Sequence, residues 1–138
     1  MPRPTKRQYE VIGEFRYQLR RFLAESERLA KAAGVTPLQY QLLLQTQARP
    51  GRDWASVREL AESLQSSPHG TVALIDRCVA LGLVERRRHP DDARRVEVHP
   101  TPGGRRLLQQ LAAAHLEQLV ALQGRFAVPD RAALRAAP

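Results

Sequence analysis

The sequence predicts a mainly α-helical fold that carries one small β-hairpin. Apolar residues recur at three- and four-residue steps over residues 8–33 and again after residue 101, a spacing typical of amphipathic helices. Between these segments, two short helical patterns are followed by two strand-like segments, 84–89 and 94–99. The chain of 138 residues is long enough to form one domain with its own core.

The first expected element is one long helix over residues 8–33, which Gly34 ends. A small core cannot cover an apolar stripe of this length. We therefore expect the helix to pair with a second copy of the chain and also to cover one side of the core. The alternative is an ordinary core helix. Its apolar positions are Val11, Ile12, Phe15, Leu19, Phe22, Leu23 and Leu29.

A second helix is expected from Thr36 to Ala48. Thr36 is the N-cap, Pro37 takes the first helical position, and Gln39 stands three residues after the cap. The turn Arg49-Pro50-Gly51 follows. Trp54, the only tryptophan, is expected to cover the core, and a ligand-pocket wall is the alternative.

The two short helical patterns form the centre of the chain. Ser56 and Glu59 have the spacing of a capping box, with Val57, Leu60, Ala61 and Leu64 as the apolar face. The next helix begins with Ser67 as N-cap and Pro68 at the first position, and Gly82 takes the left-handed C-cap. Two short helices joined by a tight turn predict a helix-turn-helix, whose second helix enters a DNA major groove. For that helix we expect a buried face made of Val72, Ile75 and Val79, broadened by Leu74, Cys78 and Leu81.

A basic hairpin follows, with Pro90-Asp91-Asp92-Ala93 as its turn. It carries Arg86, Arg87, Arg88, Arg94 and Arg95, a density of guanidinium groups that packing does not explain. The chain has 22 Lys and Arg residues, all but two of them Arg, and a net charge of +8. Arg grips phosphate through two N–H groups, so this bias favours an anionic polymer as partner. A genome rich in Arg codons is the alternative, and it would not explain the cluster in the hairpin.

The last long helix is expected to begin at Thr101-Pro102 and to reach about Phe126. Gly103 and Gly104 weaken its first turn, since each costs roughly 1 kcal/mol relative to Ala in a helix interior. Val128-Pro129-Asp130 can begin a sixth, short helix.

The block DRCVALGLVERRRHPDDARRVEVHPT, residues 76–101, resembles the winged-helix core of MarR-type bacterial transcription regulators. The resemblance covers about residues 9–122 and is specific over 56–107. The chain departs from the pattern at Ala73, where many relatives carry Arg, and at Pro100, where they carry Leu. The matching residues are Asp76-Arg77, Gly82 to Arg86, Asp92-x-Arg94 with Val96 and Val98, and Thr101.

The resemblance implies a winged helix-turn-helix over residues 36–101 within a single domain, 1–138. It also implies a homodimer formed by helices within 8–33 and 102–138, the last of them shorter than in the family. By the same match Arg94 is the wing-tip contact in the minor groove or on its phosphates, and Asp92 shapes the turn and orients that Arg.

DNA contacts are expected from the second helix of the helix-turn-helix and from the wing. Gly70, Ala73, Arg77 and Ala80 share the face opposite the expected apolar one, and the helix N-terminus attracts a phosphate. For Arg77 the alternative is a salt bridge with Asp76 or Glu85. The expected contacts are Ser67, His69, Gly70, Thr71, Ala73, Arg77, Arg87, Arg88, Arg94 and Arg95.

An effector pocket between the dimerisation helices and the winged domain is also implied by the resemblance. An aromatic or phenolic acid would suit an Arg between aromatic walls. The candidates to line the pocket are Phe15, Arg16, Leu19, Tyr40, Leu43 and Trp54.

No catalytic or metal-binding motif is present, so neither an enzyme nor a cofactor is expected. His89 and His99 lie on opposite strands and can approach one another, yet two ligands make a poor zinc site. Cys78 is expected to be a structural core residue, with redox sensing as the alternative. No apolar run is long enough for a membrane span and no signal peptide is seen, so we expect a cytoplasmic protein without membrane contacts.

The leading hypothesis is a homodimeric, sequence-specific transcription regulator, a repressor that a small molecule releases from a palindromic operator on double-stranded DNA. The alternative is a basic protein that coats nucleic acid without sequence preference or ligand control. A third interpretation, a winged module that docks another protein, is disfavoured by the arginines concentrated in the hairpin.

Overall fold

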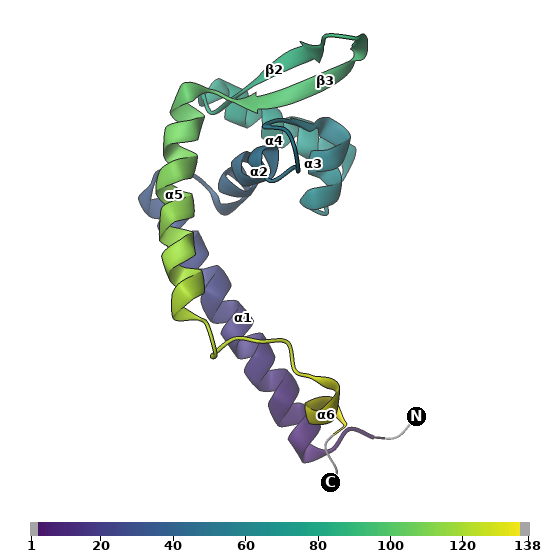
Figure 1. The fold of residues 1–138 in the computed structure, drawn as a ribbon, viewed down its shortest axis with the longest axis vertical. Coiled ribbons are helices and arrows are strands. Elements are labelled where there is room, and N and C mark those ends of the chain that lie inside the picture. Colours follow the sequence, from purple (N-terminus) through teal and green to yellow (C-terminus); the bar gives the residue numbers. More distant parts are fainter. Residues whose placement is uncertain (1–2, 136–138) are drawn as a thin grey trace.

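The computed structural model describes residues 3–135. A head that contains the sheet and most of the shorter helices sits at one end, and α1 extends away from it (Figure 1). In chain order the elements are α1 (Lys6–Ala32), α2 (Pro37–Gln47), β1 (Ala55–Ser56), α3 (Val57–Ser63), α4 (Pro68–Ala80), β2 (Val84–His89), β3 (Asp92–Pro100), α5 (Pro102–Ala121) and α6 (Arg131–Leu134).

The helices begin where local capping signals stand. Thr36, Ser56, Ser67 and Thr101 are N-caps, and the side chain of each accepts a hydrogen bond from the backbone N–H three residues later. These four starts confirm the prediction, because a cap supplies an acceptor for an otherwise unpaired N–H group. Gly82 follows α4 with a φ of 72°, the left-handed conformation predicted for it.

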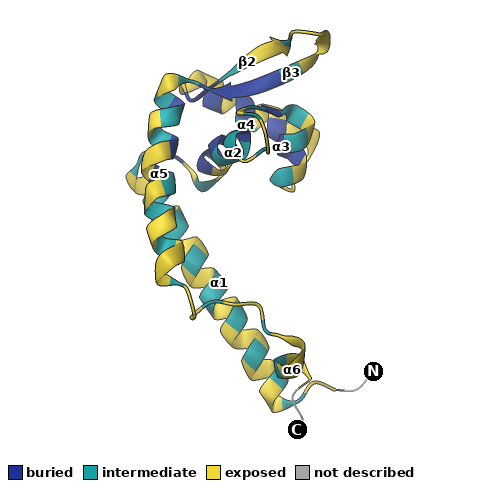
Figure 2. Ribbon diagram, in the orientation of Figure 1, coloured by how far each residue is buried: buried dark blue, intermediate teal, exposed yellow. Residues whose placement is uncertain are grey.

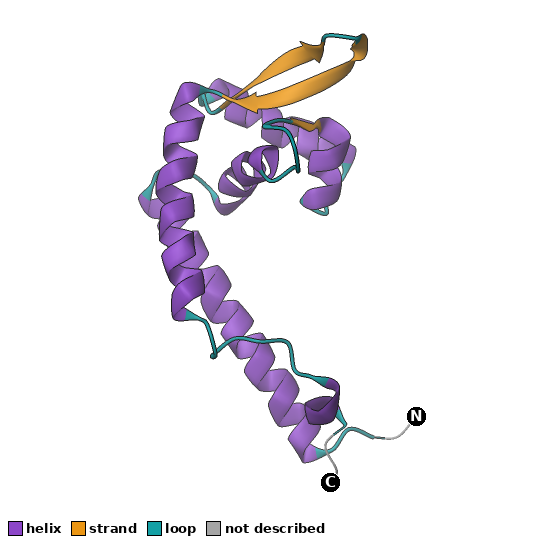
Figure 3. Cartoon of the chain, in the orientation of Figure 1, coloured by secondary structure: helices purple, strands orange, loops and turns teal. Residues whose placement is uncertain are grey.

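The sheet has three antiparallel strands in the order β1-β3-β2 (Figure 3). The two-residue strand β1 was not predicted; its Ala55 lies opposite Val98 of β3. Strand β3 begins at Asp92 rather than at Arg94, so the turn is Pro90-Asp91 alone. The hairpin of β2 and β3 is the wing.

The buried side chains gather in the head, whereas α1 and the end of α5 carry almost none (Figure 2). Every element of the head except the wing tip contributes side chains to one hydrophobic core. Its fully buried members include Leu42, Leu43, Ala55, Leu60, Ile75, Cys78 and Val98. Cys78 is therefore a core residue, as predicted.

The buried face of α4 differs from the predicted one. Thr71, Ile75 and Cys78 are fully buried, whereas Val72 is 41% exposed and Val79 is 39% exposed. The predicted face was wrong for both valines. The helix is rotated so that a buried threonine takes the place expected for a valine.

Helix α1 contributes only Ala30 to the core. Its first half is covered on one side by the segment after α5, where the rings of Phe15 and Phe126 stack with centroids 5.6 Å apart. The end of α6 is held against the start of α1, because Gln8 Nε2 donates a hydrogen bond to the Leu134 carbonyl. Helix α5 ends at Ala121, five residues before the predicted end.

The start of α5 lies against the entry to β2. An added Cβ on Gly104 would stand 2.0 Å from the carbonyl oxygen of Leu83, so this position requires glycine. Gly103 is not crowded in this way. The close approach fixes α5 relative to the strand that carries the wing.

None of the helices within residues 3–135 combines the length and the apolar character that crossing a bilayer would demand.

Candidate DNA-binding surface

The N-terminus of α4, the second helix of the helix-turn-helix, is open to solvent. Ser67 Oγ accepts from the Gly70 N–H at 3.0 Å, and residues 67–70 are all exposed. Pro68 has no N–H and the Thr71 N–H donates to the Ser67 carbonyl, so in the described chain the His69 N–H is the one left for a ligand in this turn. The helix dipole adds partial positive charge there. This end of α4 is open to a phosphate oxygen, and the DNA contacts expected of Ser67 and His69 stay a prediction.

Thr71 does not lie on this surface. Its side chain is fully buried, and its Oγ1 lies 2.9 Å from Ser66 Oγ and donates to the Ser67 carbonyl at 2.9 Å. The predicted DNA contact is wrong because both hydrogen-bonding capacities of the hydroxyl are used within the turn. Thr71 instead fastens the start of α4 to the residues before it.

The outward face of α4 carries most of the other predicted residues. Gly70, Ala73, Arg77 and Ala80 are all exposed, and Val72 adds an unpredicted apolar side chain beside them. Across residues 3–135, Arg77 takes part in no salt bridge. The two carboxylates suggested as its partners are paired with other arginines.

One of these pairs joins α4 to the wing. Arg86 Nη2 of β2 lies 2.5 Å from Asp76 Oδ1 of α4. In the other, the Arg87 guanidinium binds the carboxylate of Glu85 two residues before it on the same strand. Arg86 therefore neutralises the only carboxylate on α4, and Arg87 is partly engaged before any DNA is bound.

The tip of the wing carries exposed arginines on β2 and on an irregular stretch of β3. Arg88 pairs with Val96, but the next pair is His89 with Asp92, so residues 93–95 bulge from the ladder. Asp92 Oδ1 accepts from the backbone N–H of Arg94 at 3.0 Å. The carboxylate thus shapes the main chain that carries Arg94. Within the described part of the chain, Arg88, Arg94 and Arg95 are exposed and form no salt bridge.

The wing also carries a polar cluster, in which the two histidines expected to approach one another share the carboxylate of Glu97, a residue that the sequence analysis did not single out. Glu97 is 8% exposed; its Oε1 lies 2.8 Å from His99 Nε2, and its Oε2 lies 3.8 Å from His89 Nε2. Trp54 packs against both imidazoles, and the Arg52 guanidinium lies 4.2 Å from the centre of its ring. Across residues 3–135, no three His, Cys, Asp or Glu side chains are arranged to hold a metal ion.

The helix-turn-helix and the wing fall within a segment of the sequence that matches a known family. The sequence model of the MarR family matches residues 33–95, which include α2, the helix-turn-helix and most of the wing. This match and the shared fold support a MarR-family winged-helix regulator.

Solved MarR-family structures share the fold over most of the chain. One MarR family transcription regulator is 26% identical, with a TM-score of 0.72 over 86% of this chain and 77% of that one. AbsC from Streptomyces coelicolor is 19% identical, with a TM-score of 0.76 over 88% of this chain and 81% of that one. A mutant of MepR from S. aureus bound to an oligodeoxyribonucleotide is 18% identical, with a TM-score of 0.65 over 82% and 81%. No protein with a curated description matches the sequence.

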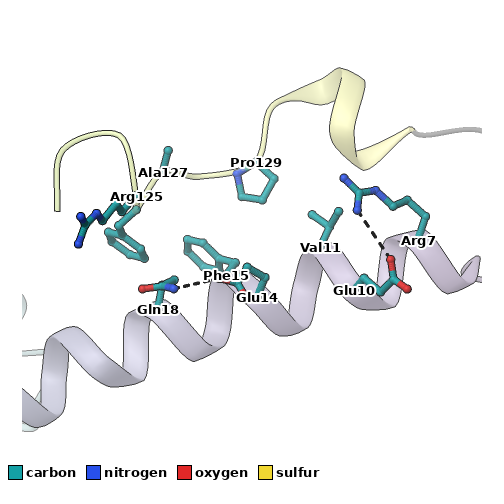
Figure 4. A pocket seen from close by; sticks show the side chains of 10 residues that line it. Arg7, Glu10, Val11, Glu14, Phe15, Gln18, Arg125, Ala127 and Pro129 are labelled. Carbon is teal, nitrogen blue, oxygen red and sulfur yellow. Dashed lines mark hydrogen bonds and ion pairs between the residues drawn. The ribbon is translucent and has the colours of Figure 1, made fainter.

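The six residues expected to line a MarR-type effector pocket do not converge. Leu43 is fully buried in the core, Trp54 lies at the base of the wing, and Arg16 is exposed on α1. Phe15 lines a groove of about 200 Å³ at the far end of α1, together with the segment after α5 (Figure 4). Only Tyr40 faces a cavity between α1, α2 and α5.

That cavity between α1, α2 and α5 has a volume of about 350 Å³. Tyr40 Oη lies 2.6 Å from His115 Nδ1, and His115 Nε2 is buried with no hydrogen-bond partner among residues 3–135. Burial raises the pKa of Tyr40 and lowers the pKa of His115, so both side chains stay neutral near pH 7. The lining residues are Phe22, Leu23, Ser26, Glu27, Pro37, Tyr40, Gln41, Leu44, Gln45, His115 and Leu119.

Proposed function

We propose that this chain is a homodimeric, sequence-specific DNA-binding transcription regulator, and that it represses until a small molecule lowers its affinity for DNA. The observation that carries the proposal is the set of exposed arginines without ion pairs on α4 and the wing, beside the open N-terminus of α4. Within the described residues these cations have no acidic partner, and a polyanion supplies one.

In the proposed complex α4 lies in the major groove and Arg94 reaches the adjacent minor groove or its phosphates. The Arg86–Asp76 pair holds the two elements together, so both can engage one half-site. The MepR mutant with an oligodeoxyribonucleotide, which shares the fold, supports DNA as the partner. In a symmetric dimer the two half-sites of a palindrome would stand about 10–10.5 bp apart.

The dimer is proposed from apolar surface that the single chain leaves in water. Isolated exposed apolar residues are ordinary, but here they are concentrated on the helices outside the head. A second copy packed along α1 and α5 would cover them. They are Tyr9 (59% exposed), Ile12 (49%), Tyr17 (55%), Leu23 (45%), Leu116 (64%), Leu119 (51%) and Val120 (65%).

The proposed effector site is the cavity beside Tyr40 and His115. Its volume of about 350 Å³ lies within the usual range for small-molecule sites, about 300–1,000 Å³. Its wall contains Glu27 but no Lys or Arg, so a carboxylate ligand would find no cation there. We therefore propose a neutral aromatic compound as the effector, in place of the aromatic acid expected from the sequence.

Selection of duplexes from a random pool, followed by competition, tests the proposal against non-specific coating. A regulator prefers its selected operator to random DNA by at least about 10³-fold, whereas a coating protein shows no preference. Arg94→Ala should weaken operator binding by about 1–3 kcal/mol. Arg87→Ala is the matched control and should cost less, because Glu85 already binds that guanidinium. Equal affinity for operator and random DNA would contradict the proposal.

A further inference from the structure

The middle of the exposed face of α4 is apolar. Val72 is 41% exposed and Ala73 is exposed beside it, one turn after the N-cap Ser67. The core does not need them, because Thr71, Ile75 and Cys78 already fill the buried side of the helix. Val72 and Val79 are the two valines that α4 leaves in water, and Val72 is the one nearer the exposed N-terminus of the helix. Its exposure there points to a partner with an apolar group at that place.

Few polar side chains on α4 are free to bind base edges. Over residues 69–77 the exposed polar side chains are those of His69, Asp76 and Arg77. Asp76 is bound to Arg86 at 2.5 Å, so its carboxylate is not free to accept from a base. Only His69 and Arg77 remain, at the two ends of this stretch, with Val72 and Ala73 between them.

The major groove offers one apolar group that distinguishes a base pair, the 5-methyl group of thymine. We propose that Val72 and Ala73 read thymine methyl groups, and that each half-site of the operator contains at least one thymine recognised in this way. This inference rests on the proposed function, since it specifies what the same surface recognises.

The surroundings of the apolar pair favour DNA over a protein as its partner. Arg77 lies on the next turn of α4, and Arg88, Arg94 and Arg95 stand on the adjoining wing, all exposed and without ion pairs in the described chain. Gly70 and Ala73 have little or no side chain, which lets the helix backbone approach the groove floor closely. The apolar side chains of Val72 and Ala73 would contact a thymine methyl group, while the arginines around them would contact the phosphates on either side of it.

The test acts first on the DNA, so it does not depend on the folding of a variant. In the selected operator, each thymine of a half-site is replaced in turn by deoxyuridine, which removes the methyl group and keeps the base pairing. We expect a loss of about fourfold in affinity at one or two positions per half-site, the factor for one buried methyl group. The loss should be about 16-fold when both half-sites are changed at the same position.

The protein side of the test uses two exposed valines of α4. Val72→Ala should reduce the preference for thymine over deoxyuridine at those positions to about twofold or less. Val79→Ala is the matched control, since Val79 is also 39% exposed but lies two turns further from the N-terminus, and it should leave the preference unchanged.

The possible results separate this inference from the function on which it rests. If the operator is bound specifically but no deoxyuridine substitution lowers the affinity, the recognition of thymine by Val72 and Ala73 is overturned. The proposed function as a transcription regulator would still stand. An equal loss of affinity on deoxyuridine substitution in the wild type and in Val72→Ala would also overturn this recognition. Failure to select any preferred sequence would overturn the proposed function itself.

Discussion

Arg86 of the wing and Asp76 of α4 form an ion pair with Nη2 and Oδ1 2.5 Å apart. The side chains are 35% and 61% exposed, so water screens their attraction and the pair contributes at most about 1 kcal/mol to folding. Its position gives it a larger effect on binding. It joins the two proposed DNA-contacting elements and cancels a negative charge on the surface that would face phosphates.

The substitution Arg86→Ala is expected to weaken operator binding by about tenfold while leaving the melting temperature nearly unchanged. The reason is that an unpaired Asp76 would then repel the DNA backbone, most strongly at low salt. Fluorescence anisotropy at two salt concentrations measures the effect.

The double variant Arg86→Ala with Asp76→Asn is the control for this interpretation. It should recover part of the lost affinity, because the repelling charge is gone. If the two substitutions simply add, with no recovery, the pair does not act through Asp76.

The substitution Gly104→Ala is expected to lower the free energy of unfolding by about 2 kcal/mol or more, because the new Cβ would overlap the Leu83 carbonyl. Gly103→Ala is the matched control, since the nearest heavy atom to its Cβ would be 3.7 Å away. That change should be neutral or stabilise α5 by up to about 1 kcal/mol. Urea unfolding compares the two variants, and equal effects would refute the role given to Gly104.

Cys78 is expected to be unreactive in the folded protein. Burial raises the pKa of its thiol from 9.0 to about 11, so almost no thiolate exists near pH 8. The buried neutral thiol favours folding below about pH 9 and this contribution is lost as the pH rises toward 11. A thiol reagent should therefore label the native protein slowly and the urea-unfolded protein fast. Rapid labelling of the native protein would instead favour redox sensing.

His115 should make stability depend on pH. Burial lowers its pKa below the ordinary 6.5, so the neutral ring is favoured in the folded state. The stabilisation is present above about pH 6.5 and is lost as the pH falls through the lowered pKa. His115→Gln should flatten the change in unfolding free energy between pH 7 and pH 5.

His69→Gln is the control for the pH effect, because His69 is exposed on α4. It should leave the pH dependence as in the wild type. An unaltered pH dependence in His115→Gln would show that another group is responsible.

Four of the helix starts could be predicted because each is encoded within four residues. A cap such as Thr36 or Ser56 needs only the backbone that follows it, and Gly82 needs only its own φ. The wing could be predicted as well, from two strand-like segments and the turn between them. Strand β1 has no such local signal, since its two residues are ordered by pairing with β3 more than 40 positions later.

The buried face of α4 could not be chosen from its pattern. Val72, Ile75 and Val79 fit helical spacing as well as Thr71, Ile75 and Cys78 do, and hydrophobicity favours the valines. The structure selects the second set because the Thr71 hydroxyl is satisfied by Ser66 and Ser67 before it is buried. For the same reason Thr71 was placed on the DNA surface and Val72 was not.

The effector pocket was the weakest prediction because it depends on how α1, α2 and α5 cross. Aromatic and basic residues of the right chemistry, such as Phe15 and Trp54, are held in different parts of the molecule. His115 and Tyr40 are 75 residues apart in the sequence, and only the crossing of α2 and α5 brings them together.

The central claim is that exposed arginines of two wings and two α4 helices bind DNA phosphates, and the salt dependence of operator affinity tests it most directly. If a dimer neutralises about eight phosphates, the slope of log K against log salt concentration should be near −7. Anisotropy titrations from about 50 to 200 mM salt would give this slope. A slope near zero, or no binding to duplex DNA even at the lowest salt concentration, would contradict the account.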